Sequence, residues 1–168
     1  RLHRRFIAFK AFVKEAYMFS YSKYIIDAHA HIFPDKIAQK AADNIGKFYD
    51  LYMNFDGTAD TLIEEGGKCG VSKYVVQSVA TVPHQVKRIN DFIVQSVEKY
   101  PDRLIGFGSL HPDMKGMEEE IDRLISLGLH GIKLHPDFQN FAINEEKACR
   151  IYDAVGDKLP FLIHTGDK

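Results

Sequence analysis

Two hydrophobic periods alternate along this chain, and that alternation restricts its fold more than any other feature. Short apolar runs typical of buried strands recur, and between them apolar residues also return every three or four positions, as on one face of a helix. Strands and helices that alternate in this way are typical of βαβ units around a parallel sheet. The sequence therefore predicts an α/β protein with five strands and four connections. The predicted strands lie at 24–31, 72–79, 103–110, 131–135 and 160–164.

The four connections differ in how clearly they predict helices. The last three carry apolar stripes at helical spacing, over 84–100, 117–128 and 144–155. The first connection, 36–71, is the longest, and a capping box at Thr61 and Glu64 predicts that a helix starts there. It also carries a group of aromatic residues that we interpret as core rather than as a lid, namely Phe48, Tyr49, Tyr52 and Phe55.

Histidines gather at the predicted strand ends. Four of the five predicted strands finish on histidine, and turn-forming residues follow directly. The carboxyl ends of parallel strands meet at one edge of the sheet, which is where α/β proteins bind their ligands. Five of the eight histidines fall at this predicted ligand edge, namely His29, His31, His111, His135 and His164.

The histidine pair in "YIIDAHAHIFPD", residues 24–35, is the most specific of these signals. Side chains two positions apart in a strand point to the same face, so His29 and His31 present two imidazoles together. Imidazole is the commonest metal ligand, so the pair is typical of half a metal site; two hydrogen-bonded core histidines are the alternative. Other chemistries have weaker signals, because there is no G-x-G-x-x-G after a strand, no phosphate-loop spacing and no nucleophile elbow.

Composition narrows the class of protein further. The 168 residues are enough for one sizeable domain, and the net charge of −1 gives no electrostatic reason to expect nucleic acid or a membrane surface as a partner. Cys69 and Cys149 lack metal-ligand spacing, as expected of free thiols in a reducing compartment, so we expect a cytoplasmic protein. Residues 1–22 are predicted to form a basic N-terminal extension of the domain at 23–168, with 1–17 loosely attached and of uncertain native origin.

Three segments of the chain together resemble a known family. "IIDAHAHIFPD", "GIKLHPDFQ" and "PFLIHTGD" resemble the amidohydrolase superfamily, in its amidohydrolase-related branch of metal-dependent hydrolases and decarboxylases. The resemblance covers about residues 24–167 and implies a TIM-type (β/α)8 barrel. Such a barrel needs roughly 250 residues. The resemblance therefore implies that this chain is a fragment, the N-terminal five βα strands of the truncated barrel.

The same resemblance implies roles for the strand-end histidines. His29 and His31 would be the metal ligands of strand one and His164 the ligand of strand five, holding a divalent metal that we expect to be zinc. His135 would be the catalytic residue, which polarises the substrate or handles a proton. The family's last metal ligand, an aspartate at the end of strand eight, has no counterpart here, so the fragment alone is expected to be inactive.

Three more residues are candidates for the surroundings of the metal. Lys133 shares a strand face with His135; binuclear relatives carbamylate a lysine at such a position, but a packed or solvent-capped lysine is the favoured interpretation here. Asp27 lies one step deeper than His29 on the same face and would orient an imidazole. His111 has no counterpart in the family pattern, and we interpret it as a pocket-lining residue.

The resemblance implies a metal-dependent hydrolase, in which a metal-activated water attacks a C–N or related bond of a small molecule. A metal-dependent decarboxylase of a small carboxylic acid would use the same ligands and is the enzymatic alternative. A non-catalytic metal-binding module is the third interpretation. The expected partner is a small-molecule substrate, with no nucleic acid and no membrane, and the residues leave a homo-oligomer open.

Overall fold

The computed structural model describes residues 25–165, and all five predicted strand regions form parallel strands in it. The strands are β1 (Ile25–His31), β2 (Val71–Gln77), β3 (Leu104–Gly106), β4 (Gly108–Ser109), β5 (Ile132–Leu134) and β6 (Phe161–Ile163). Hydrogen bonds join them in the orders β1-β2-β3 and β4-β5-β6, so neighbours in sequence are neighbours in space. The predicted extension over 1–22, with its segment 1–17, lies outside the described residues.

The third predicted strand, 103–110, forms two pieces on either side of Phe107. The first piece, β3, pairs with β2, whereas the second piece, β4, pairs with β5. Hydrogen bonding continues through the break, because the Phe107 amide donates to the Val76 carbonyl and the Gly108 amide donates to the Gly131 carbonyl. Successive parts of one strand thus serve successive neighbours, and this stagger is what closing a sheet into a barrel requires.

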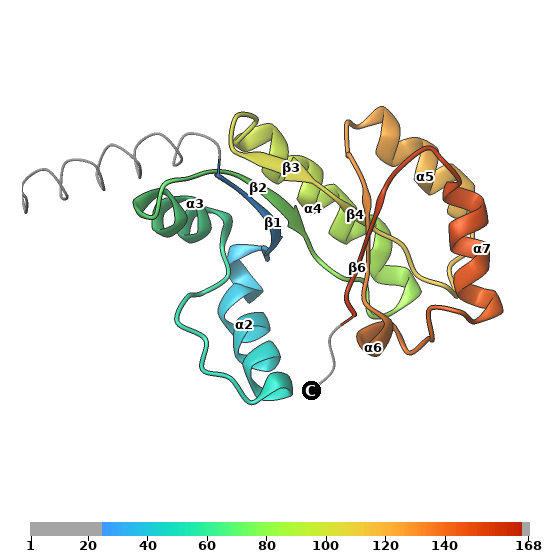
Figure 1. The fold of residues 1–168 in the computed structure, drawn as a ribbon, viewed down its shortest axis with the longest axis horizontal. Coiled ribbons are helices and arrows are strands. Elements are labelled where there is room, and N and C mark those ends of the chain that lie inside the picture. The colour runs from blue at the N-terminus through green and yellow to red at the C-terminus, as the bar shows by residue number, and fades with distance from the viewer. Residues whose placement is uncertain (1–24, 166–168) are drawn as a thin grey trace, which may run out of the picture.

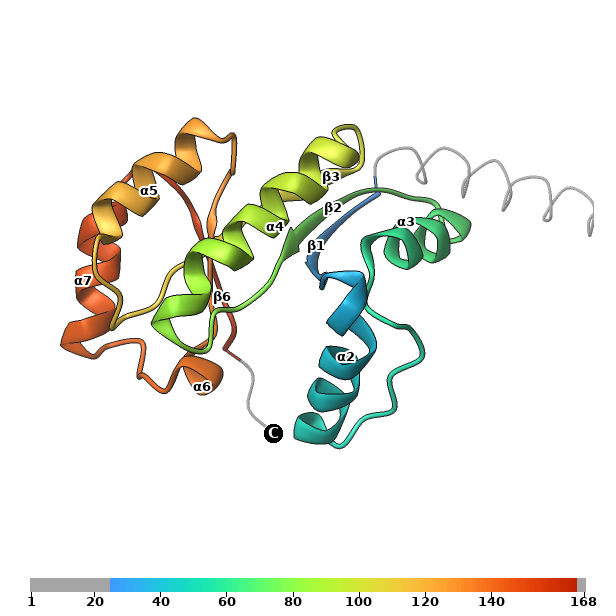
Figure 2. The same ribbon diagram turned by 180° about the vertical axis from the view of Figure 1, so that it is seen from behind.

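The predicted helical connections are confirmed, and the first connection contains two helices. The α-helices are α2 (Asp35–Tyr49), α3 (Ala59–Lys68), α4 (Val86–Lys99), α5 (Met117–Ser126), α6 (Pro136–Gln139) and α7 (Glu146–Val155), with a 3-10 turn, η1 (Pro83–Gln85), before α4. In the views from opposite sides, α4 lies behind the strands in Figure 1 and in front of them in Figure 2. None of the helices within residues 25–165 is long and apolar enough to cross a membrane.

The predicted start of α3 is wrong by one turn. The N-cap is Thr58, whose hydroxyl accepts a hydrogen bond from the Thr61 amide, and the helix begins at Ala59. Asp56 accounts for the earlier start, because its carboxylate accepts from both the amide and the hydroxyl of Thr58 and holds that residue outside the helix. Thr61 and Glu64 therefore lie inside the helix rather than forming a capping box.

The main core lies between the sheet and its helices. Side chains that point outward from the strands are almost fully buried there, namely Tyr74, Val76, Leu104, Ile132 and Leu134. Gly106 allows α4 and the loop after α5 to approach the strand closely, since a Cβ at that position would lie 2.9 Å from Val97 of the helix and 2.5 Å from Leu129 of the loop. Apolar burial of this kind supplies most of the favourable free energy of folding.

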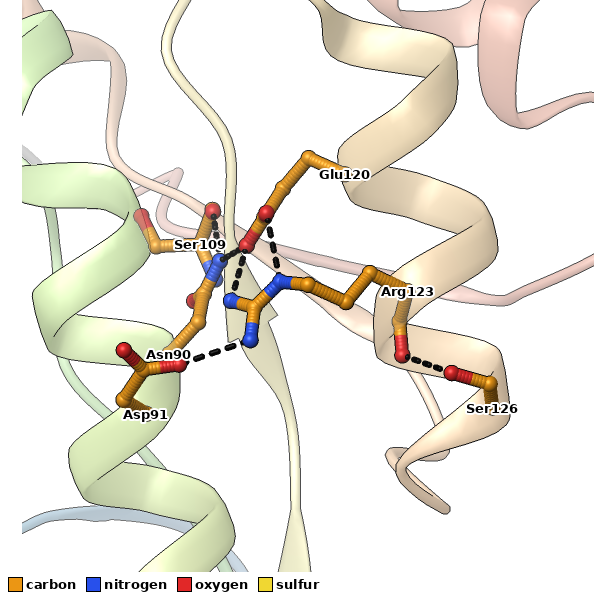
Figure 3. A network of polar contacts seen from close by, with 6 residues as sticks. All are labelled: Asn90, Asp91, Ser109, Glu120, Arg123 and Ser126. Carbon is orange, nitrogen blue, oxygen red and sulfur yellow. Dashed lines mark hydrogen bonds and ion pairs between the residues drawn. The ribbon is translucent and has the colours of Figure 1, made fainter.

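A buried polar network ties α4, β4 and α5 together (Figure 3). The Asn90 amide donates to the Glu120 carboxylate at 2.7 Å and to the Ser109 carbonyl at 3.0 Å, and its oxygen accepts from the Ser109 amide at 2.7 Å. Arg123 holds the same carboxylate with two hydrogen bonds and reaches Asp91 with a third. Each buried polar group of Asn90 and Glu120 is thus satisfied, which fixes the end of β4 relative to two helices.

Candidate metal centre

Four predicted site histidines lie around one cavity at the carboxyl ends of the strands. The cavity has a volume of about 790 Å³, and its wall includes His29, His31, His135 and His164. These side chains come from β1 and from the residues that directly follow β5 and β6. Chain segments more than 100 residues apart in sequence therefore meet at one place, as the strand-end pattern predicted.

The two histidines of β1 point their ring nitrogens at each other. His29 Nε2 and His31 Nε2 lie 3.2 Å apart. Zinc holds imidazole nitrogens at about 2.0–2.1 Å in a tetrahedral arrangement, which places two of them about 3.3 Å apart. The pair therefore has the spacing of two ligands of one ion.

Both histidines of this pair are neutral at pH 7 in the metal-free protein. Burial is the main cause, and the Lys133 ammonium adds to it; together with neighbouring imidazoles they lower the pKa of His31 to about 3. Burial and Lys133 also lower the pKa of His29. A neutral imidazole has a free lone pair, and that is the form that binds metals.

Lys133 is fully buried and belongs to this cluster. Its Nζ lies 3.1 Å from His29 Nε2. Burial lowers the pKa of the ammonium group to about 8, since taking a charge out of water disfavours the charged form. The side chain is packed, and its Nζ is directed at His29 of the candidate site.

His135 and His164 stack on each other on the other side of the cavity. Their ring centroids are 4.1 Å apart with nearly parallel planes, and Phe138 stacks on the opposite face of His135 at 3.9 Å. The hydroxyl of Tyr49 lies 3.1 Å from His135 Nε2 and 3.0 Å from His164 Nε2. Burial, followed by the neighbouring His164 and Lys133, lowers the pKa of His135 to about 4.

Two other candidates do not have the contacts that were expected of them. Asp27 lines the cavity, but its carboxylate accepts from the backbone amide of His29 at 2.9 Å rather than from an imidazole. His111 is buried and is not among the residues of this cavity wall, so its pocket-lining role stays a prediction. Its ring is held locally, because Nδ1 accepts a hydrogen bond from the backbone amide of Asp113 at 3.1 Å.

Two residues of the site were missed or misjudged in the sequence. Tyr49 belongs to the aromatic group that was interpreted as core, and the structure places its hydroxyl among the site histidines. Gln139 is almost fully buried and joins three strand ends: its oxygen accepts from the His135 amide, and its nitrogen donates to the carbonyls of Ala80 and Leu110. Its presence in "KLHPDFQ" was visible, but nothing in the spacing predicts which loops such an amide joins.

The rest of the cavity wall is largely apolar and rich in aromatic rings. The aromatic members, apart from the histidines, are Phe33, Tyr49, Tyr52, Phe55, Tyr74 and Phe138. A wall of this kind suits a small organic molecule with an unsaturated ring, and the histidines supply the few polar groups that would orient it.

A comparison with protein families adds an independent observation. A family model described as Amidohydrolase matches residues 26–167. The chain belongs to the amidohydrolase family. No curated protein matches it.

Solved structures of other amidohydrolase-type proteins share the fold. A 5-carboxyvanillate decarboxylase of Novosphingobium aromaticivorans with bound manganese has a TM-score of 0.66 and 21% identity, over 86% of this chain and 51% of its own. A 4-oxalomesaconate hydratase of Rhodopseudomonas palustris has a TM-score of 0.56 and 20% identity, over 84% and 52%. A 2-pyrone-4,6-dicarboxylic acid hydrolase of Acinetobacter baumannii, assigned as probable, has a TM-score of 0.55 and 20% identity, over 84% and 49%. The chain thus spans about half the length of these TIM-barrel relatives.

Proposed function

We propose that this chain supplies the metal-binding side of the active site of a divalent-metal-dependent hydrolase, which cleaves a C–N or related bond of a small molecule. The observation that carries the proposal is the convergence of His29 Nε2 and His31 Nε2 to 3.2 Å, with His164 and His135 in the wall of the same cavity. When bound, the ion would supply a water activated for attack at neutral pH.

The donor chemistry of the site fits such an ion. Within residues 25–165 no three His, Cys, Asp or Glu side chains surround one point suited to a metal. Two imidazoles already have the spacing of a ligand pair, and His164 Nε2 is turned toward the Tyr49 hydroxyl instead. His29, His31 and His164 would hold the ion once His164 exchanges that hydroxyl for it. Three imidazoles suit zinc, and manganese is the alternative that the decarboxylase relative favours.

His135 would polarise the substrate. Its pKa of about 4 keeps the imidazole neutral at pH 7, so it offers an N–H donor without placing a positive charge beside the metal. Gln139 holds the backbone amide of His135 at 2.9 Å, and Phe138 holds its ring by stacking. The side chain is therefore fixed before a substrate arrives, as polar stabilisation of a reacting group requires.

Decarboxylation of a small aromatic carboxylic acid is a second candidate function. The aromatic wall of the cavity favours it, because a flat unsaturated ring packs well against Phe33 and Phe138. The relatives include a 5-carboxyvanillate decarboxylase and a 2,6-dihydroxybenzoate decarboxylase. Both reactions would use the same histidines, so the substrate rather than the ligand set separates them.

Metal content tests the proposal directly. A protein that carries this chain as part of a whole barrel is expected to hold about one divalent ion per chain, and H29A/H31A is expected to lose it, because two of its three imidazole ligands are gone. H84A/H130A is the matched control, since it removes two exposed histidines that lie outside the cavity wall. Undiminished metal in H29A/H31A, measured by elemental analysis, would show that the site is assigned wrongly.

Product analysis then separates the two reactions. A metal-loaded protein that carries this chain as part of a whole barrel is incubated with 2,6-dihydroxybenzoate and, separately, with 2-pyrone-4,6-dicarboxylate. Release of carbon dioxide from the first would favour the decarboxylase, and ring opening of the second would favour the hydrolase. Either activity should disappear in H29A/H31A and persist in H84A/H130A.

A further inference from the structure

We propose that Gln77 is a positioning residue of the candidate metal centre, and that its side-chain oxygen accepts the Nδ1 hydrogen of His31 when His31 Nε2 holds the ion. The inference rests on the proposed function, because it assumes that His31 is a ligand. It adds a residue of β2, a strand that supplies none of the four histidines in the cavity wall.

The side chain of Gln77 is buried without hydrogen-bond partners. Gln77 is the last residue of β2 and is fully buried. Among the described residues, neither its side-chain nitrogen nor its side-chain oxygen has a partner. Buried polar groups nearly always have partners in folded proteins, because an unsatisfied one costs free energy. An amide at this position, rather than an apolar side chain of the same size, therefore indicates a partner in the functional state of the protein.

The register of the sheet places Gln77 beside His31. β1 and β2 run parallel, and Ala30 pairs with Val76 and His31 with Gln77. Ala30 and Val76 belong to the main core, so the next residue of each strand points to the opposite, inner face. The Ile32 amide donates to the Gln77 carbonyl at 3.3 Å and fixes this register just past the pair. Neighbouring strands lie about 4.7–4.9 Å apart, so the two side chains are direct neighbours.

His31 has a hydrogen that needs an acceptor when the ring binds an ion. Its Nε2 faces His29 Nε2 at 3.2 Å and would be the ligand atom, so the proton of the neutral ring is on Nδ1. Within residues 25–165, the contact between the two Nε2 atoms is the only hydrogen bond of the His31 ring. Histidines that bind metals almost always donate their other ring N–H to an oxygen, which fixes the orientation of the ring. The Gln77 oxygen is such an acceptor on the same face.

Gln77 suits this role better than Asp27, the residue for which the sequence predicted it. Asp27 lies four residues before His31 on the same strand, and its carboxylate accepts from the His29 backbone amide at 2.9 Å. Gln77 is instead the direct neighbour of His31, and its amide has no other bond that it would have to give up. The last torsion of a glutamine side chain has only broad preferences, so the amide can turn toward the imidazole at little cost.

Zinc binding and stability, measured on the same variants, test the role of Gln77. In a protein that carries this chain as part of a whole barrel, Q77L is expected to bind zinc roughly 10–100-fold more weakly, the usual effect of removing such a partner. The metal-free variant should be no less stable than the wild type, because leucine removes two buried polar atoms that lack partners. Q95L is the matched control, since it makes the same change at an exposed glutamine of α4 outside the cavity wall.

The Nδ1 hydrogen of His31 gives a readout that a packing role would not change. In the zinc-loaded protein with nitrogen-15 histidine, its NMR signal is expected to shift and to exchange faster with water in Q77L, and to stay unchanged in Q95L. Equal zinc affinity in Q77L and Q95L, or an unchanged His31 signal in Q77L, would overturn the inference and leave the proposed function standing. A metal-free Q77L less stable than the wild type would assign Gln77 to packing and overturn the inference too. Absence of zinc from the wild-type protein would overturn the proposed function, and the inference with it.

Discussion

The two faces of the sheet are built from alternate residues of the same strands, yet they differ in almost every property. On the outer face, Val76, Leu104 and Leu134 are 0–3% exposed and pack against helices. On the inner face, Val75 and Ile105 pair across neighbouring strands but remain only partly buried. The outer face is thus a completed core, whereas the apolar part of the inner face has few neighbours among the described residues.

The segment "GIKLH" shows how sharply the two faces are separated. Ile132 and Leu134 point outward into the core, while Lys133 and His135, one residue away in each case, point inward to the candidate metal centre. A strand alternates its side chains with a period of two, so one segment serves both faces. Stability comes mainly from the outer residues, whereas the proposed chemistry would use the inner ones.

Truncating an outer residue should have the largest effect on stability. Leu134 is fully buried in the main core, and L134A is expected to lower the free energy of unfolding by about 2–5 kcal/mol, because it removes buried methyl groups and leaves a cavity. Chemical unfolding of the purified protein measures the change. L127A is the control, since that leucine is 42% exposed and should cost less than about 1 kcal/mol. Equal losses for the two variants would break the contrast between core and surface.

The network in Figure 3 should come next, because it secures the outer helices to β4. N90A would leave the Glu120 carboxylate and the Ser109 amide without one partner each, at an expected cost of about 2–3 kcal/mol. S126A is the control, since its exposed hydroxyl only donates to the Arg123 carbonyl. If N90A unfolds at the same denaturant concentration as S126A, the network does not contribute to stability.

The histidines of the inner face should make the stability of the fold sensitive to acid. In the metal-free fold the pKa values are about 3 for His31 and about 4 for His135, below the ordinary value of 6.5. Between pH 6.5 and 4 the unfolded chain therefore binds protons that the fold does not, so stability should fall as the pH is lowered through this range. Urea midpoints in a chelating buffer at pH 7 and pH 5 measure the fall. It should be smaller in H31N/H135N, and an equal fall would assign the effect to other groups.

The outer face was more predictable from the sequence than the inner one. The spacing of hydrophobic residues predicts which side chains point to the helices. It also located all five strand regions and the helices at 84–100, 117–128 and 144–155. The third strand still divides at Phe107, because its partners are set by the stagger of the whole sheet. Local pattern carries no information about that stagger.

The histidines of the site could be predicted because they are tied to strand ends, whereas their partners could not. Parallel strands bring His29, His135 and His164 to one edge whatever the loops do. Tyr49 reaches them from α2, and its position depends on the angle at which that helix packs. His111 follows the strand-end rule in sequence, but it is not among the residues of the cavity wall, and its ring accepts a hydrogen bond from the backbone amide of Asp113.

The smallest predicted effect on stability comes from replacing Lys133, and it should have the opposite sign to the effect of L134A. Lys133 is as buried as Leu134, but it is polar and faces inward. Burying its charge at neutral pH therefore costs free energy. K133M keeps most of the volume without the charge, so the metal-free variant should be as stable as the wild type at pH 7, or more stable by about 1 kcal/mol.

The pH dependence of Lys133 gives this last prediction a sharper form. The pKa is about 8 in the fold and 10.5 ordinarily, so between these values the unfolded chain binds a proton that the fold has released. The stability of the metal-free wild type should therefore rise with pH over this range, and the rise should be smaller in K133M. K87M, at an exposed lysine of α4, should keep the rise. A large loss of stability in K133M at pH 7 would mean that the ammonium group is a favourable partner of His29, and that the inner face also contributes to holding the fold together.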